Sequence, residues 1–225
     1  MRRYRLYHKS WRLSIPFSKK YVLLYCVFFY NAIDNRYLLY YTINIFSIGG
    51  DFLKYRTKKL TTSAVFAAII CVVTTFVAVP APAIGNINLG DIFILCAAWI
   101  LGPWGAAAAG IGACLADLLS GFAIYAPATF VIKALMALAC YYLFVFLNKF
   151  IKHQIFSRLL SALVAEAVMV TGYFIYESIL YGFSVAIASV PFNLIQGSVC
   201  LVIGTLCSIL LYKSHVVRSF CKKLN

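Results

Sequence analysis

Long apolar stretches fill most of this chain after its first 60 residues, and they constrain the fold more than any other feature. Of the 225 residues, 64% are hydrophobic and 12% are charged, whereas soluble domains are nearer half apolar and a quarter charged. This composition is typical of a polytopic protein embedded in a lipid bilayer. It excludes a cytosolic globular protein, a disordered chain and a nucleic-acid-binding module, so no nucleic-acid partner is expected.

Six apolar segments follow one another from residue 60 onward, and each predicts a membrane helix. They are expected at about residues 61–79, 88–101, 103–119, 127–147, 159–180 and 191–212. Pro103, Pro127 and Pro191 are each predicted to open a helix, because proline is favoured in the first helical turn. The predicted fold class is therefore an all-α integral membrane protein, a bundle of six transmembrane helices.

The basic residues of this region alternate with the predicted helices in a way that orients them. Clusters of Lys and Arg occur at residues 56–59, 149–158 and 213–223. The three connections that would lie on the other side contain neither residue; they are residues 80–87, 120–126 and 181–190. Because basic loops stay in the cytoplasm, both termini are predicted to be cytoplasmic. A bacterial plasma membrane is the expected location.

The N-terminal segment differs from the rest. Residues 1–59 hold 12 of the 20 Lys and Arg residues and nine of the 16 tyrosines, without a sustained helical period. We expect residues 1–57 to be an extension and residues 58–225 to be the membrane domain. The run Gly49–Leu53 back-translates into a ribosome-binding sequence, a spacer and a UUG start, so the native protein is expected to begin near Leu53. A basic, aromatic-rich surface segment is the alternative.

Cysteine and histidine give no sign of a metal site, a cofactor or an enzyme. The eight cysteines show no CxxC spacing and fall mostly within apolar runs, where they serve as small fillers. The three histidines, His8, His153 and His215, lie outside the predicted helices. An intramembrane hydrolase would need a base or metal ligand within the bundle. No phosphate-binding G-x-x-x-x-G-K-[ST] motif occurs, so ATP is not expected to bind this chain.

Ionisable residues within membrane segments mark candidate sites, because each costs about 2.5–3.5 kcal/mol at a helix centre on insertion scales. Five are present: Asp91, Asp117, Lys133, Glu166 and Glu177. By the predicted orientation, all except Glu166 lie in the outer half of the membrane. Alternatives remain, since Asp91 fits a capping role after Asn88. Lys133 requires an anion, which is a ligand, Asp91 or Asp117, and Asp117 is the preferred protein partner.

Uncharged polar residues of the last two helices extend this group. Tyr173 shares a helix face with Glu177, and Asn193 shares one with Gln196. The candidate substrate-binding residues are therefore Asp91, Asp117, Lys133, Tyr173, Glu177, Asn193 and Gln196. Tyrosines at the outer side either stack on a flat heterocycle or form an interfacial belt; they are Tyr125, Tyr173, Tyr176 and Tyr181.

Several of these residues stand in sequence runs that resemble a known family. The runs are Ile87–Asp91, Leu101–Gly105, Gly110–Ala113, Ala116–Gly121, Tyr125–Thr129 with Ile132 and Lys133, and Asn193–Gln196 after Pro191. They are similar to the substrate-binding (S) component of energy-coupling factor (ECF) vitamin transporters, riboflavin-type branch. The resemblance covers about residues 58–215. The sequence departs from it after Lys133, where Ala134, Ala137 and Ala139 stand instead of the expected glycines.

The resemblance implies a function and partners. It implies capture of a water-soluble vitamin outside the cell, with riboflavin as the first candidate and a thiamine precursor or pyridoxine as alternatives. It implies docking on a transmembrane coupling subunit and two cytoplasmic ATPase subunits, with Ala64 and Ala68 of the first helix facing the coupling subunit. A membrane assembly or scaffold protein without transport activity is the rival hypothesis.

Overall fold

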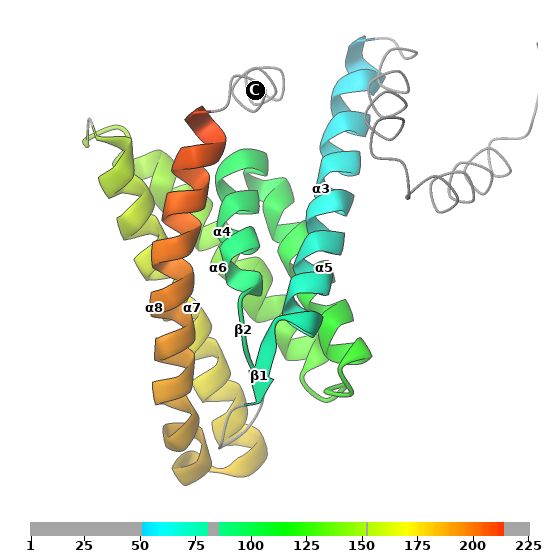
Figure 1. The fold of residues 1–225 in the computed structure, drawn as a ribbon, viewed down its shortest axis with the longest axis vertical. Helices are drawn as coiled ribbons and strands as arrows, with labels where there is room; N and C mark the ends of the chain where they lie inside the picture. The colour runs from blue at the N-terminus through cyan, green and yellow to red at the C-terminus, as the bar shows by residue number, and fades with distance from the viewer. Residues whose placement is uncertain (1–50, 81–85, 152, 214–225) are drawn as a thin grey trace, which may run out of the picture. The chain divides into compact units, whose positions relative to one another are not determined.

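A computed structural model describes residues 51–80, 86–151 and 153–213. Within these residues the chain forms six helices and one short hairpin (Figure 1). They are α3 (Asp51–Phe76), β1 (Ala78–Pro80), β2 (Asn86–Asn88), α4 (Gly90–Leu101), α5 (Pro103–Leu119), α6 (Ala126–Leu147), α7 (Gln154–Tyr181) and α8 (Phe183–Lys213). The predictions for residues 1–50, which include most of the extension, lie outside the described residues, as does the C-terminal tail beyond residue 213.

The six helices differ in whether they can cross a bilayer alone. Helices α3, α6, α7 and α8 contain apolar segments of at least 21 residues, which is enough for a hydrocarbon core of about 30 Å. Helices α4 and α5 have 12 and 17 residues and are shorter than that. The predicted all-α membrane bundle with six helices is confirmed, with four long and two short members.

The predicted start of the last helix is wrong. Helix α8 begins at Phe183 and contains Pro191 in its interior, so most of the expected connection at 181–190 is helical. The break between α7 and α8 is Gly182, whose φ of 88° lies in the region that favours glycine. Proline is tolerated inside membrane helices because neighbouring groups satisfy the freed backbone, so Pro191 alone was an ambiguous start signal.

A β-hairpin occupies the predicted connection between the first two helices. Strands β1 and β2 pair antiparallel, with Ala78 opposite Asn88 and Pro80 opposite Asn86. The predicted N-cap at Asn88 is displaced by one residue, since Leu89 precedes α4 and makes no side-chain cap. Asn88 instead accepts a hydrogen bond through Oδ1 from the Gly90 N–H at 3.0 Å. The hairpin therefore leads directly into α4.

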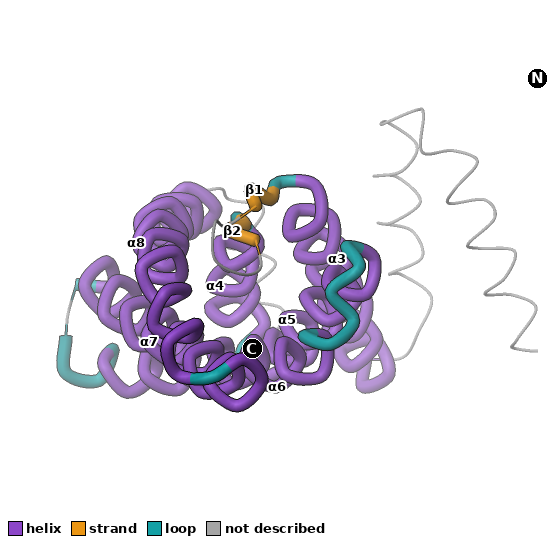
Figure 2. Tube along the Cα trace, turned by 90° about the horizontal axis from the view of Figure 1, so that it is seen from below, coloured by secondary structure: helices purple, strands orange, loops and turns teal. Residues whose placement is uncertain are grey.

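Helix α4 lies in the middle of the bundle and contacts α5, α6 and α8 (Figure 2). Ten of its 12 residues are buried, and its Leu95 belongs to the same apolar core as Met136 of α6 and Met169 of α7. Helix α3 approaches α5 closely at Gly112, where an added Cβ would come within 2.5 Å of the Ala67 carbonyl oxygen. A glycine is needed there because no side chain fits.

A buried arginine sits at the end of the bundle away from the hairpin. Arg158, near the start of α7, is 2% exposed. Its guanidinium carbon lies 5.4 Å from the ring centre of Trp99, 5.2 Å from that of Phe144 and 4.3 Å from that of Tyr212. The ends of α4, α6, α7 and α8 thus meet around one cation.

Candidate functional site

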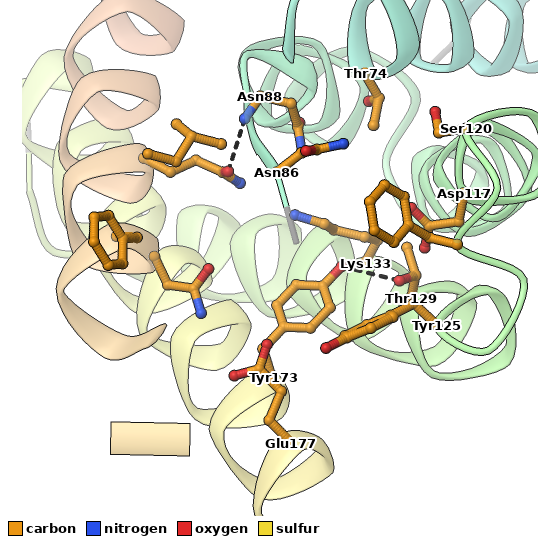
Figure 3. A pocket seen from close by; sticks show the side chains of 15 residues that line it. Thr74, Asn86, Asn88, Asp117, Ser120, Tyr125, Thr129, Lys133, Tyr173 and Glu177 are labelled. Atoms are coloured by element: carbon orange, nitrogen blue, oxygen red, sulfur yellow. Dashed lines mark hydrogen bonds between the residues drawn. The ribbon is translucent and has the colours of Figure 1, made fainter. Parts of the chain in front are cut away.

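A polar pocket opens near the hairpin. The empty space between its walls, counted together with open solvent at its mouth, is about 670 Å³. Its lining comes from α3, β2, α5, the α5–α6 connection, α6, α7 and α8 (Figure 3). The residues are Thr74, Asn86, Ile87, Asn88, Asp117, Ser120, Phe122, Tyr125, Thr129, Lys133, Tyr173, Glu177, Phe192, Asn193 and Gln196.

Lys133 forms the base of this pocket together with a carboxylate from α4. Its Nζ donates to Asp91 Oδ1 at 2.6 Å, and the two side chains are 3% and 0% exposed. The sequence favoured Asp117 as the partner of Lys133, and that prediction is wrong. Asp91 lies in the first turn of the central helix, so its carboxylate reaches Lys133 on α6 directly.

Gln196 of α8 completes the same network. Its Nε2 donates to Asp91 Oδ2 at 2.7 Å, and its Oε1 accepts from the backbone N–H of Asn88 at 2.9 Å. Both ends of the amide are therefore bound by the protein. The network joins α4, α6, α8 and β2, and it satisfies a charge pair that would be costly to leave incomplete.

Fewer of the polar atoms on the opposite wall of the pocket are hydrogen-bonded within the protein. Asp117, near the end of α5, has a buried Oδ2 with no hydrogen-bond partner among the described residues. Thr129 and Tyr173 hydrogen-bond each other across 3.1 Å, and Lys133 Nζ lies 5.4 Å from the Tyr173 ring centre. In Figure 3, Lys133 lies between the hairpin asparagines and Tyr173, with Asp117 to one side.

Aromatic residues and Glu177 form the remaining wall. Glu177 is 3% exposed and accepts a hydrogen bond from the Ser189 hydroxyl. Of the four outer tyrosines, Tyr125 and Tyr173 line the pocket. Tyr176 and Tyr181 pack against Tyr125 instead, with ring centres 5.6 and 6.4 Å away.

Six of the seven residues predicted to bind substrate line this one pocket, and the seventh, Asp91, is bonded to two of them. The structure therefore brings the predicted group together, while their contact with a ligand stays a prediction. Sequence reasoning missed Thr74, Asn86, Ser120 and Thr129, because single polar residues in apolar runs give little signal. The run Asn86-Ile87-Asn88 does give a signal, because alternate residues of a strand share a face and the two asparagines therefore lie on the same side.

Glu166 of α7 lies outside the pocket lining. It is 4% exposed, and neither carboxyl oxygen has a hydrogen-bond partner among the described residues. Its side chain packs close to Gly197 of α8.

Comparison with known proteins gives the family. Residues 54–213 match the family model described as "ECF-type riboflavin transporter, S component". The chain belongs to this family. Members of this family are substrate-binding components of transporters and are not enzymes. The chain is therefore a multi-pass membrane protein that captures a vitamin-type substrate. Membership implies association with ECF coupling and ATPase subunits.

Among the individual relatives, one name states a cargo and one solved structure is named as an S component. The chain is 32% identical over 168 residues to "Thiamine precursor transporter HmpT" of Lactococcus lactis subsp. cremoris (strain MG1363), covering 73% of this chain and 94% of that protein. It is 34% identical over 139 residues to an uncharacterised protein of Pyrococcus woesei, covering 60% and 88%. A solved S component of a bacterial ECF transporter matches with a TM-score of 0.56 and 27% identity, covering 70% of this chain and 95% of that one.

Proposed function

We propose that this S component captures a small heterocyclic vitamin or vitamin precursor in the polar pocket, from outside a bacterial plasma membrane. The observation that carries the proposal is the pocket itself, in which polar side chains from every long helix converge within an apolar bundle. Riboflavin is the candidate that the family name suggests, and a thiamine precursor is the candidate that the Lactococcus relative suggests.

Ligand binding by the purified protein tests this directly. A ligand that binds only the folded state raises stability by RT ln(1 + [L]/Kd), which is about 2.7 kcal/mol at 100 Kd. The detergent-purified chain is therefore expected to melt at higher temperature with one member of a vitamin panel, in a saturable manner. No saturable binding to folded protein would favour the scaffold hypothesis instead.

Orientation is part of the proposal. By the positive-inside rule, the basic clusters favour a cytoplasmic position for both termini, and the pocket would then open outward. A reporter that is active only in the cytoplasm, fused after residue 225, is expected to be active. An inactive reporter on a correctly inserted protein would contradict the outward-facing pocket.

Docking on the coupling subunit is proposed for one face of α3. Ala64 and Ala68 are exposed there, and on the same stripe Leu60 is 61%, Val72 53% and Phe76 80% exposed. Small residues four apart let a second helix approach closely in lipid. Such a stripe is expected to receive a coupling helix, while the two ATPase subunits act from the cytoplasm.

The docking proposal predicts a separation of functions. The double substitution Ala64→Leu with Ala68→Leu should abolish uptake and co-purification with the coupling subunit, and ligand binding by the isolated chain should survive. Val131→Leu is the matched control, because Val131 is 53% exposed on a different helix, α6. Uptake retained in the double variant would remove the docking role.

A further inference from the structure

Glu166 is a buried carboxyl group that belongs neither to the pocket lining nor to the ion pair. It is 4% exposed, and neither of its oxygens has a hydrogen-bond partner among the described residues. It lies near the middle of the 28-residue helix α7, inside the segment that can cross the membrane. An ionised carboxylate at this position would be buried with neither a cation nor a donor bound to it, which is a costly arrangement.

The Glu166 side chain lies close to the network at the base of the pocket. Its Cβ and its Oε2 are each 3.2 Å from the position that a Cβ on Gly197 of α8 would take, so the missing side chain of Gly197 makes room for the carboxyl group. Gly197 follows Gln196, whose amide holds Asp91. Asp91 and Lys133 both act electrostatically on Glu166. Glu166 therefore shares the surroundings of the ion pair without being bonded to it.

The titratable groups that act on Glu166 come from three neighbouring helices. They are Asp91 of α4, Lys133 and Cys140 of α6, and Cys200 of α8. Thiols are uncharged near neutral pH, so one ammonium stands among two carboxyl groups. If both carboxyl groups were ionised, the buried cluster would have an excess negative charge, whereas with one of them protonated it is neutral. Two carboxylates that share one site do not both ionise readily.

Hydrogen bonding decides which of the two carboxyl groups is charged. Asp91 accepts from Lys133 at 2.6 Å and from Gln196 at 2.7 Å, and such donors stabilise the ionised form. Glu166 has no donor among the described residues. We propose that Glu166 binds a proton and is the reserve counter-ion of Lys133. When Lys133 loses Asp91, the O–H bond of Glu166 breaks, the proton passes to solvent, and the remaining carboxylate neutralises the ammonium.

A reserve counter-ion allows the base of the pocket to move. A shift of α8 or α4 that separates Asp91 from Lys133 would otherwise leave an ammonium buried alone, which is strongly destabilising. Helix α7 packs against α6, so Glu166 on α7 is positioned to neutralise Lys133 on α6 during such a shift. The proposal concerns the protein without ligand, and it holds for any vitamin that the pocket takes.

Infrared spectroscopy of the full chain in detergent tests for the proton directly. The difference between the spectra of the parent and of Glu166→Gln isolates this side chain. It is expected to show the carbonyl stretch of a protonated carboxylic acid, which shifts in heavy water. Carboxylate bands in its place would overturn the proton site. Glutamine has the shape and the neutral charge of protonated glutamic acid, so this variant is expected to fold.

Two further backgrounds test the reserve role. With Asp91→Asn, the same Glu166→Gln difference is expected to show carboxylate bands, because Glu166 has then released its proton. Asp117→Asn is the matched control background, since Asp117 lines the pocket but forms no salt bridge with Lys133 in the described part of the chain. The acid band should persist there. An acid band that also persists with Asp91→Asn would overturn the reserve role.

Unfolding equilibria without ligand give an independent measure. Glu166→Gln alone should change the unfolding constant by less than about threefold, because a neutral amide replaces a neutral acid. Combined with Asp91→Asn, the loss should exceed the product of the two single effects by at least about tenfold, or about 1.4 kcal/mol, because Lys133 then has neither counter-ion. A combined loss equal to that product would overturn the reserve role, as would an Asp91→Asn chain that fails to fold. Neither result bears on vitamin capture, since no ligand enters these measurements.

Discussion

Two cations are buried among the described residues, and the two ends of the bundle accommodate them differently. Lys133, near the hairpin, is held by the Asp91 carboxylate, which Gln196 holds in turn. Arg158, at the far ends of α4 and α6, has no carboxylate within salt-bridge distance in the described part of the chain. Three aromatic rings surround it instead.

The difference follows from the chemistry of the two side chains. A lysine ammonium is a compact, strongly hydrated charge, so its burial requires a counter-ion. A guanidinium is delocalised and weakly hydrated, and it stacks on aromatic faces. The lysine end therefore depends on polar partners that also form a pocket wall, while the arginine end depends on ring packing between helix termini. The first is suited to binding a ligand, and the second to closing the bundle.

The largest effect is expected from breaking the lysine pair. Lys133→Met leaves Asp91 buried without its counter-ion, and removing one partner of such a pair costs about 3–5 kcal/mol. Unfolding of the unliganded protein in detergent measures the loss, and ligand binding should be lost with it. Adding Asp91→Asn should recover much of the stability, whereas adding Asp117→Asn should not. Strictly additive losses for the Lys133 and Asp91 substitutions would contradict the pair.

A smaller loss is expected from the amide that supports the pair. Gln196→Ala removes the N–H that donates to Asp91 Oδ2 and the oxygen that accepts from the Asn88 N–H, so it should cost about 1–3 kcal/mol. Asn193→Ala is the control, since Asn193 lines the pocket one turn earlier but is not part of this network. It should change unfolding by about 0.5 kcal/mol or less. Equal losses for the two variants would mean that Gln196 has no special structural role.

Removing the buried arginine should lower the unfolding free energy less than removing the buried lysine. Arg158→Met gives up cation–π contacts worth about 2 kcal/mol when desolvated, and the packing of its aliphatic stem is largely kept. It leaves no carboxylate without a counter-ion, so the expected loss is about 1–2 kcal/mol. Unfolding measurements beside Lys133→Met test the ranking. A greater loss of stability for Arg158→Met than for Lys133→Met would show that the burial of Arg158 depends on an anion as well as on the rings.

The smallest change in stability is expected at Asp117. Asp117→Asn removes a carboxyl group whose Oδ2 has no donor among the described residues, so the unfolding free energy should change by about 0.5 kcal/mol or rise slightly. Calorimetric unfolding without ligand measures this. A loss above about 2 kcal/mol would place Asp117 in the structural network beside Asp91 and would leave it less available to a ligand.

The sequence by itself determined the membrane class, the number of helices and six of the 15 residues that line the pocket. Apolar run length and small-residue spacing are local properties of the sequence. An ionisable residue within a bilayer is costly, so its presence alone marks it as a candidate site residue. For that reason Asp117, Lys133 and Glu177 could be singled out before any contact was known. The family resemblance then supplied the expected cargo class, which chain composition alone does not contain.

Only the tertiary structure decided how the charges pair. Asp91 and Asp117 were both plausible partners of Lys133, and the position of the short helix α4 within the bundle gives the contact to Asp91. The sequence did not reveal the interior position of Pro191, because proline fits both a helix start and a helix interior. It did not reveal the aromatic rings around Arg158 either, because those contacts join four helix ends that are far apart in sequence. Pairing depends on where helices cross, and the packing of all six sets those crossings.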